Sequence, residues 1–154
     1  MENEQNQIIK TMQALNLPSD QYAVFGSGLM DVLGLKKAND IDLLVAERLF
    51  DKLGQKTEWK RFIYPDGYPG LKHTVYDLEL FYESKMPFCS QAEIEEKIRR
   101  AIAIDGVKFV QLSDILAWKK AFGREKDLRD AALIEHYLHD SDVLTENHKI
   151  GDLR

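Results

Sequence analysis

The sequence predicts one domain of the α/β class, and two observations lead to this prediction. Short apolar segments of strand length alternate along the chain with segments whose apolar residues recur at helical spacing. The 154 residues are 44% hydrophobic and 31% charged, which is enough apolar material for one core and too many charges of both signs for a membrane or disordered protein. No linker divides the chain, so we expect a single domain over residues 1–154 with its core at about residues 21–138.

The first quarter of the chain is expected to form a helix, a strand and a second helix. Glu2–Leu15 carries apolar residues at helical spacing and stops before Pro18, which predicts a helix that covers the core. Tyr22–Phe25 is a short apolar run of strand length. The segment Gly26–Gly28 then predicts a tight turn, and Leu29–Leu33 predicts a short helix after it.

The middle of the chain predicts a central strand, a helix and a pair of strands. Asp40–Val45 alternates acidic and aliphatic residues before it becomes wholly apolar, which is typical of a central strand whose leading end reaches solvent. Ala46–Leu53 has the apolar spacing of a helix. Thr57–Tyr64 and Leu71–Tyr82 have the composition and alternation of strands, and Pro65–Gly70 between them is rich in turn residues. We therefore expect these two segments to form an antiparallel pair.

The last third of the chain is expected to be mainly helical. Helices are predicted at Gln91–Arg100, Asp114–Phe122 and Glu125–Leu138. Between the first two, Asp105-Gly106 is the signature of a type I′ turn, so Ala101–Ile104 and Val107–Val110 should form a hairpin. Ser113 is the expected N-cap of the second helix. Residues 140–154 are expected to form a polar tail.

The sequence favours a cytoplasmic protein without a membrane partner. Its first ten residues are polar and acidic where a signal peptide would be basic and then apolar, and no stretch approaches the roughly 18 apolar residues of a spanning helix. The single cysteine, Cys89, cannot form an internal disulfide and is expected to be a small buried residue. The formal net charge of −5 argues against strong unspecific binding to nucleic acid.

Gly26, Ser27 and Gly28 form a candidate phosphate site. The backbone N–H groups of a glycine turn that opens a helix point toward one place, with the positive end of the helix dipole behind them. A phosphate can approach closely because glycine has no side chain, and Ser27 can add its hydroxyl. The same turn is also an ordinary connection between a strand and a helix, so it carries weight only in combination with other elements.

Asp40 and Asp42 form a candidate metal site. Side chains two residues apart on a strand point to the same face, with Cα atoms about 6.6 Å apart, so both carboxylates can bind divalent ions. Asp77 or Glu79 on a later strand would supply the third carboxylate of a two-metal site for phosphoryl transfer. Ligands that are all oxygen favour Mg²⁺ or Mn²⁺. Taken alone, the two aspartates also fit a solvated strand end.

These elements together resemble the nucleotidyltransferase superfamily that includes DNA polymerase β, and especially its small, single-domain bacterial members. Phe25-Gly26-Ser27 resembles the apolar-Gly-[Gly/Ser] element of the family, Asp40-Ile41-Asp42-Leu43 its paired acids, and Leu78-Glu79-Leu80 its third acidic strand. The helical end, Val110–Lys120 and Gly123–Asp130, resembles that of many of these proteins, including relatives of toxin-type nucleotidyltransferases.

The resemblance implies a minimal nucleotidyltransferase fold, in which helices flank a mixed sheet. It also implies a Mg²⁺-dependent enzyme that moves an NMP from an NTP to an acceptor hydroxyl while pyrophosphate leaves. Asp40 and Asp42 would then bind two metals, and Glu79 would be the third ligand and help to activate the acceptor. Glu79 is preferred because its apolar neighbours match the family better and its side chain is longer, with Asp77 as the alternative third acid.

The resemblance further implies which residues bind the nucleotide. The turn at Gly26–Gly28 would hold phosphates, and Lys119 matches the helix lysine of the family and is expected to touch a phosphate. Arg124 and Lys126 are further candidates for the same contact. These cations also fit a solvated helix face, since Lys126 and Asp130 have the spacing of an i,i+4 ion pair.

The acceptor is left open by the sequence, which fits a small molecule, a tRNA or a protein hydroxyl equally well. Two other classes of function also remain. The chain fits a non-catalytic module that binds a nucleotide or a partner, including one half of a toxin–antitoxin pair, and it fits a purely structural interaction protein. An enzyme needs all three carboxylates, whereas a binding module needs only the glycine turn and some cations. The presence of the three acids in this chain favours the enzyme.

Overall fold

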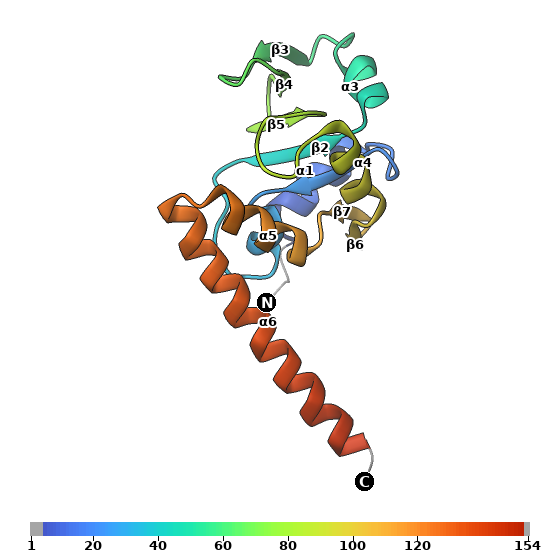
Figure 1. Cartoon of the computed structure of the whole chain (residues 1–154). Helices are drawn as coiled ribbons and strands as arrows, with labels where there is room; N and C mark the ends of the chain where they lie inside the picture. The colour runs from blue at the N-terminus through green and yellow to red at the C-terminus, as the bar shows by residue number, and fades with distance from the viewer. Residues whose placement is uncertain (1–4, 153–154) are drawn as a thin grey trace.

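The computed structural model describes residues 5–152 and the side chains of residues 5–141. Seven strands form one sheet in the order β3-β4-β5-β2-β1-β7-β6 (Figure 1). The strands are β1 (Tyr22–Phe25), β2 (Ile41–Val45), β3 (Trp59–Ile63), β4 (Pro69–His73), β5 (Leu78–Phe81), β6 (Ile102–Ile104) and β7 (Val107–Phe109). The helices are α1 (Gln7–Leu15), α2 (Gly28–Val32), α3 (Glu47–Leu53), α4 (Gln91–Arg99), α5 (Leu112–Phe122) and α6 (Glu125–Asp152). The predicted α/β class is therefore confirmed.

The sheet is mixed, and β2 lies at its centre as the sequence predicts. β2 is antiparallel to β1 and parallel to β5, while β1 is parallel to β7. The pairs β3–β4, β4–β5 and β6–β7 are antiparallel. A strand with neighbours on both edges and helices on both faces has to be apolar at most positions, and four of the five residues of β2 are buried. The exception is Asp42, which is half-buried.

Helices cover both faces of the sheet. On one face the core contains apolar side chains of α1 and α3, such as Ile9 and Phe50. On the other face a second core cluster joins α4, α5 and α6 to the sheet through residues such as Ile94, Trp118 and Ile134. Because strand side chains alternate between faces, the central strands β1, β2 and β5 contribute to both clusters.

The first helix is shorter than predicted. Its N-cap is Asn6, whose side-chain oxygen accepts hydrogen bonds from the backbone N–H groups of Ile8 and Ile9, so the helix begins at Gln7 and not at Glu2. Residues 1–4, which the prediction included, lie outside the described part of the chain. The helix ends where expected, at Leu15, because Asn16 adopts a left-handed conformation with φ 49°.

The segment Leu71–Tyr82 does not form the single strand that its alternation predicts. It is divided between β4 and β5 by a turn after His73. The imidazole Nδ1 of His73 accepts hydrogen bonds from the backbone N–H groups of Val75 and Tyr76, both at 3.1 Å, and this local pairing replaces the ladder bonds of a continuous strand. The prediction of an antiparallel pair with the preceding strand is confirmed for β3 and β4.

Two turn predictions near the C-terminal helices have different outcomes. Asp105 and Gly106 both have positive φ, 49° and 78°, as a type I′ hairpin turn requires, so that prediction is confirmed. Ser113 is not the N-cap of α5, because the helix already begins at Leu112. Gln111 occupies the cap position, and its carbonyl accepts hydrogen bonds from the backbone N–H groups of Asp114 and Ile115.

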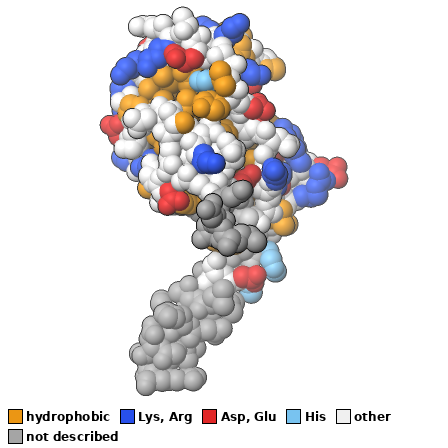
Figure 2. All heavy atoms as spheres, turned by 180° about the vertical axis from the view of Figure 1, so that it is seen from behind, with side chains coloured by type: hydrophobic (Ala, Val, Ile, Leu, Met, Phe, Trp, Pro, Cys, Tyr) orange, Lys and Arg blue, Asp and Glu red, His pale blue; other side chains and the backbone are white. Residues whose placement is uncertain are grey.

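The last helix extends beyond its predicted end at Leu138 and reaches Asp152, so most of the predicted polar tail is helical. No proline interrupts this stretch, and polar residues are compatible with a solvated helix. Figure 1 shows the second half of α6 projecting away from the sheet. Seen from behind, the sheet domain carries a group of apolar side chains surrounded by charged ones (Figure 2). Within residues 5–152, no helix combines the length and the apolar character that a membrane span requires.

Candidate active site

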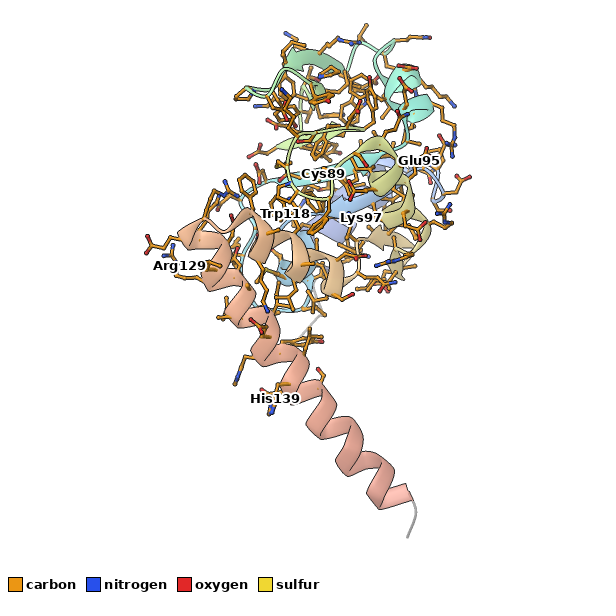
Figure 3. All side chains as sticks on the ribbon, in the orientation of Figure 1. Cys89, Glu95, Lys97, Trp118, Arg129 and His139 are labelled. Carbon is orange, nitrogen blue, oxygen red and sulfur yellow. The ribbon has the colours of Figure 1, made fainter. Side chains whose placement is uncertain are left out.

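The register of the central strands brings Asp42 and Glu79 together. Asp42 on β2 lies opposite Phe25 on β1 and opposite Glu79 on β5. Residues paired in this way point to the same face of a sheet, here the face covered by α5 and α6. Trp118 lies on α5 (Figure 3). Its ring packs on that face against Phe25, with ring centroids 4.7 Å apart. The two carboxylates therefore lie at the edge of an aromatic cluster.

One pocket beside these carboxylates, the aromatic pocket, has a volume of about 510 Å³. Asp40, Asp42 and Glu79 contribute to its lining. Its aromatic lining residues are Phe25, Tyr64, Phe81, Trp118 and Phe122. Flat aromatic walls beside carboxylates are suited to a planar ring that carries hydrogen-bonding groups.

The outer wall of the aromatic pocket is held in place by Asp66. This residue belongs to the loop between β3 and β4, and its carboxylate accepts hydrogen bonds from the hydroxyl of Ser84 and the backbone N–H of Lys85. Those partners belong to the loop that follows β5. Asp66 thus ties together two loops that are distant in the sequence and that both line the pocket.

A second pocket, the cationic pocket, adjoins the first and has a volume of about 140 Å³. Gly26 and Ser27 form part of its wall. The basic residues that line it are Lys36, Lys37, Lys119, Arg124 and Lys126. Residues shared by both pockets are Gly26, Asp40, Asp42, Trp118, Arg124 and Lys126. The predicted acidic pair, Asp40 and Asp42, therefore lies where an aromatic pocket and a cationic pocket meet.

The carboxyl of Asp42 is strongly disfavoured as an anion. Burial is the main cause, followed by the negative charges of Asp40 and Glu79, and together they raise its pKa from 3.8 to about 7. Lys126 opposes this shift with its positive charge. The carboxyl of Asp42 therefore stays protonated to a higher pH than an ordinary aspartate does.

Glu79 is held by a tyrosine that sequence reasoning did not identify. The hydroxyl of Tyr64 donates a hydrogen bond of 3.1 Å to Oε1 of Glu79. The tyrosine ring lies directly over Gly70, where a Cβ atom would approach Tyr64 Cε2 to 2.5 Å. The lack of a side chain at Gly70 is therefore what allows Tyr64 to reach Glu79.

The three residues of the glycine turn have different surroundings. Gly26 has a φ of 70°, which favours glycine, and a Cβ on it would lie 3.5 Å from Oδ2 of Asp42. Ser27 is the N-cap of α2, but its side chain makes no capping hydrogen bond. Gly28 is not among the residues that line either pocket, and a Cβ on it would approach Cγ1 of Val24 to 2.4 Å. Close packing of α2 on β1 thus requires glycine at this position.

The three predicted nucleotide-binding cations all line the cationic pocket, but they differ in burial and in ion pairing. Lys119 is buried and donates a hydrogen bond of 2.9 Å to Asp130. Arg124 donates to both carboxylate oxygens of Asp127, at 2.6 and 3.1 Å. Lys126 is exposed, and the predicted pair between Lys126 and Asp130 is not formed, since Asp130 is occupied by other lysines.

Asp77, the alternative third acid, lies apart from Glu79. It precedes β5 and is exposed, and its backbone carbonyl accepts a hydrogen bond from Ile41. It lines a separate polar groove and neither of the two pockets, although its charge adds to the shift of Asp42. The expectation that both acids lie on one strand is wrong for Asp77, because β5 begins at Leu78.

Sequence reasoning missed Tyr64, Lys36, Lys37 and Asp130 as parts of this region. The sequence analysis assigned no role to Lys36 and Lys37, yet they line the cationic pocket together with Gly26 and Ser27. The signal that could have found them is their place shortly before Asp40, since the loop into a central strand reaches the same end of the sheet as its first residues. Trp118 is buried and also lines both pockets.

Among the described residues, no three side chains of His, Cys, Asp or Glu are arranged so that they could already hold a metal ion. Comparison of the chain with protein-family models, with curated proteins and with solved structures gave no match.

Proposed function

We propose that this protein is a nucleotidyltransferase that uses Mg²⁺ or Mn²⁺ to move an NMP from an NTP to an acceptor hydroxyl. The observation that carries the proposal is the position of Asp40 and Asp42 between an aromatic pocket and a cationic pocket. An NTP has a planar base at one end and a polyanion at the other, so its two ends match the two pockets. The reacting phosphate between them would then lie beside the carboxylates.

The residues present fit a divalent hard cation. The candidate ligands, the carboxylates of Asp40, Asp42 and Glu79, supply only oxygen, which is the ligand type that Mg²⁺ and Mn²⁺ prefer. Burial and then the neighbouring carboxylates raise the pKa of Asp42, so a cation bound here would stabilise its ionised form. When bound, the metal would neutralise both the carboxylates and the phosphates that approach them.

The protein residues have distinct tasks in the proposed reaction. Arg124 and Lys126 would attract the triphosphate, and the hydroxyl of Ser27 is available to donate to it. Glu79, oriented by Tyr64, would draw the proton from the acceptor hydroxyl. The acceptor oxygen forms a bond to the α-phosphorus, the bond from this phosphorus to its β-bridging oxygen breaks, and pyrophosphate leaves with the electron pair.

Transfer of label from each of the four α-³²P-labelled NTPs, with Mg²⁺ and cell extract, tests the proposal. We expect one class of molecule to become labelled, and Asp42→Asn and Glu79→Gln to reduce labelling by a hundredfold or more, on the order of 3 kcal/mol of transition-state stabilisation. Asp77→Asn is the matched control, since it removes a nearby carboxylate that lines neither pocket, and it should change labelling only a few-fold.

Thermal denaturation with and without Mg²⁺ and NTP separates the enzyme from a binding module. Stabilisation by Mg²⁺ and NTP that is lost in Asp42→Asn, without transfer to any acceptor, would indicate a non-catalytic nucleotide-binding module. Full metal-dependent stabilisation in Asp42→Asn would refute a metal site at these carboxylates.

A further inference from the structure

A cluster of three charged residues joins the loop before Asp40 to helices α5 and α6. Asp130 of α6 accepts hydrogen bonds from Lys36 at 3.0 and 2.9 Å, one to each carboxylate oxygen, and from Lys119 at 2.9 Å. The Asp130 side chain is 6% exposed and that of Lys119 is 4% exposed, whereas Lys36 is 35% exposed. One buried carboxylate therefore holds two ammonium groups, and only one of these is accessible to solvent.

The ammonium of Lys36 retains a donor for a ligand. A lysine ammonium has three N–H groups, and Lys36 directs hydrogen bonds to the two oxygens of Asp130, so one donor remains. Lys36 lines the cationic pocket together with Ser27 of the glycine turn. The positive charge of Lys36 therefore lies at the wall of a pocket and not on an open surface.

The backbone on both sides of Lys36 is also fixed. The N–H of Leu35 donates to the carbonyl of Met30 at 2.8 Å, and the N–H of Ala38 donates to Oδ2 of Asp31 at 2.8 Å. Asp130 adds a restraint on the Lys36 side chain itself. Holding a long side chain in one conformation costs entropy. Because Lys36 is already held in the folded protein, a ligand that binds it does not have to restrict this side chain further.

We propose that Lys36 binds the triphosphate of the nucleotide, and that Asp130 is the positioning residue that presents the Lys36 ammonium to the cationic pocket. That the anion is the triphosphate of a nucleotide rests on the proposed function. Lys36 lies four residues before Asp40 on the same loop, and the sequence analysis did not assign it to substrate binding. In this proposal it forms one wall of the cationic pocket.

Lys37 provides a matched comparison for this proposal. It follows Lys36 in the chain, lines the same pocket and carries the same charge, but its side chain is exposed. Among the described residues it is not part of the Asp130 cluster. Lys36→Gln and Lys37→Gln therefore remove equal charge from one pocket and differ in whether the lost ammonium was held in place.

The first experiment measures binding of inorganic tripolyphosphate by isothermal titration calorimetry, without metal and at fixed ionic strength. We expect Lys36→Gln to weaken binding on the order of tenfold and Lys37→Gln by at most about threefold. Lys36→Arg should restore most of the affinity, because it keeps a charged donor. Equal losses in the two glutamine variants, or no loss in Lys36→Gln, would overturn the proposal.

The second experiment tests the role of Asp130 with a double-mutant cycle. Asp130→Asn should weaken tripolyphosphate binding several-fold in the wild-type background and have no effect in the Lys36→Gln background, because its action passes through Lys36. A loss of equal size in both backgrounds, or tighter binding in Asp130→Asn, would contradict a positioning role. If Asp130→Asn fails to fold, because it leaves Lys119 buried without an anion, the comparison of Lys36→Gln with Lys37→Gln decides the proposal.

Failure of this proposal can be distinguished from failure of the proposed function. The tripolyphosphate measurement needs neither metal nor acceptor, so it can succeed even if no transfer is found. Conversely, transfer of label that is lost in Asp42→Asn, together with unchanged tripolyphosphate binding in Lys36→Gln, would retain the proposed enzyme and reject Lys36 as a triphosphate-binding residue.

Discussion

Asp42 is the residue on which the electrostatics of the site depend. Its carboxyl has a folded-state pKa of about 7 against an ordinary value of 3.8, first because it is buried and then because Asp40 and Glu79 are negative. For an acid with a raised pKa, the folded state binds more protons than the unfolded state between these values. Ionisation of Asp42 therefore lowers the free energy of unfolding as the pH rises from about 4 to 7, in the absence of a cation.

The same property predicts a pH dependence of metal binding. Below pH 7 a metal ion has to displace a proton from Asp42, so we expect Mn²⁺ affinity to rise with pH by at most about tenfold per unit and to level off above pH 7. Calorimetric titrations between pH 5.5 and 8.5 measure this directly. Asp42→Asn should bind Mn²⁺ weakly and lose the rise near pH 7, whereas an affinity of the wild type that is constant from pH 6 to 8 would exclude Asp42 as a ligand.

Tyr64 predicts a second effect at the level of one residue. Tyr64→Phe removes the donor to Glu79 but keeps the ring, so the free energy of unfolding should change by no more than about 1 kcal/mol while Mn²⁺ affinity falls on the order of tenfold. Tyr68→Phe in the same hairpin loop is the control and should bind Mn²⁺ like the wild type. Gly70→Ala should act in the same direction as Tyr64→Phe, because its Cβ would displace the Tyr64 ring. Wild-type affinity in both variants would contradict the role given to Tyr64.

The residues that were predictable are those whose role follows from local periodicity. Asp40 and Asp42 are two residues apart, and both line the same two pockets as this spacing predicts. Tyr64 and Lys36 could not be found in this way. Their roles depend on partners that are distant in sequence, Glu79 for the tyrosine and Asp130 for the lysine.

At the level of elements, the turn between β4 and β5 is the clearest departure from the pattern. Alternation predicted one strand through Leu71–Tyr82, because alternation reports which side chains are buried and does not report which backbone groups pair. The side chain of His73 supplies the competing acceptor that starts the turn. By contrast, the Asp-Gly turn between β6 and β7 was predictable, since both residues have the positive φ values that favour this dipeptide.

His73 makes the stability of this turn depend on pH. Burial lowers its pKa below the ordinary 6.5, opposed only in part by the charge of Glu58, and its Nδ1 can accept two backbone hydrogen bonds only while it is unprotonated. The unfolded state therefore binds more protons just below pH 6.5, and the free energy of unfolding should fall as the pH drops through that value.

Urea denaturation of the wild type and of His73→Asn, at several pH values from 5 to 8, tests this expectation. Asparagine can still accept with its side-chain oxygen but does not titrate, so the stability difference between the two proteins should shrink on going from pH 8 to 5. A difference that is independent of pH would show that His73 does not titrate in this range.

For the whole molecule, α6 combines two parts with different environments. Its first half packs on α5, buries Ala131 and Ile134, and supplies Asp130 to the charge cluster. Its second half projects from the domain (Figure 1). Among the side chains that the structure describes, those that join α6 to the core therefore all precede Ser141.

A chain that ends at Ser141 should consequently keep its fold. We expect its melting temperature to lie within a few degrees of that of the full chain, because no core residue described in either cluster is removed. Differential scanning calorimetry measures this. A chain that ends at Ala131 is the comparison, and it should unfold at a much lower temperature because Ile134 is lost from the core. Equal destabilisation of both chains would assign a structural role to residues 142–154.

The parallel pairing of β1 with β7 sets a condition on how the chain folds during synthesis. Val24 pairs with Phe109, and more than half of the chain separates them, whereas β3–β4 and β6–β7 are hairpins between neighbours in sequence. One edge of β1 has no partner until the ribosome has released β7, which at about 5–20 residues per second takes several seconds. During that time β1, which contributes four consecutive buried residues to the finished sheet, is an apolar segment with an unpaired edge on the nascent chain.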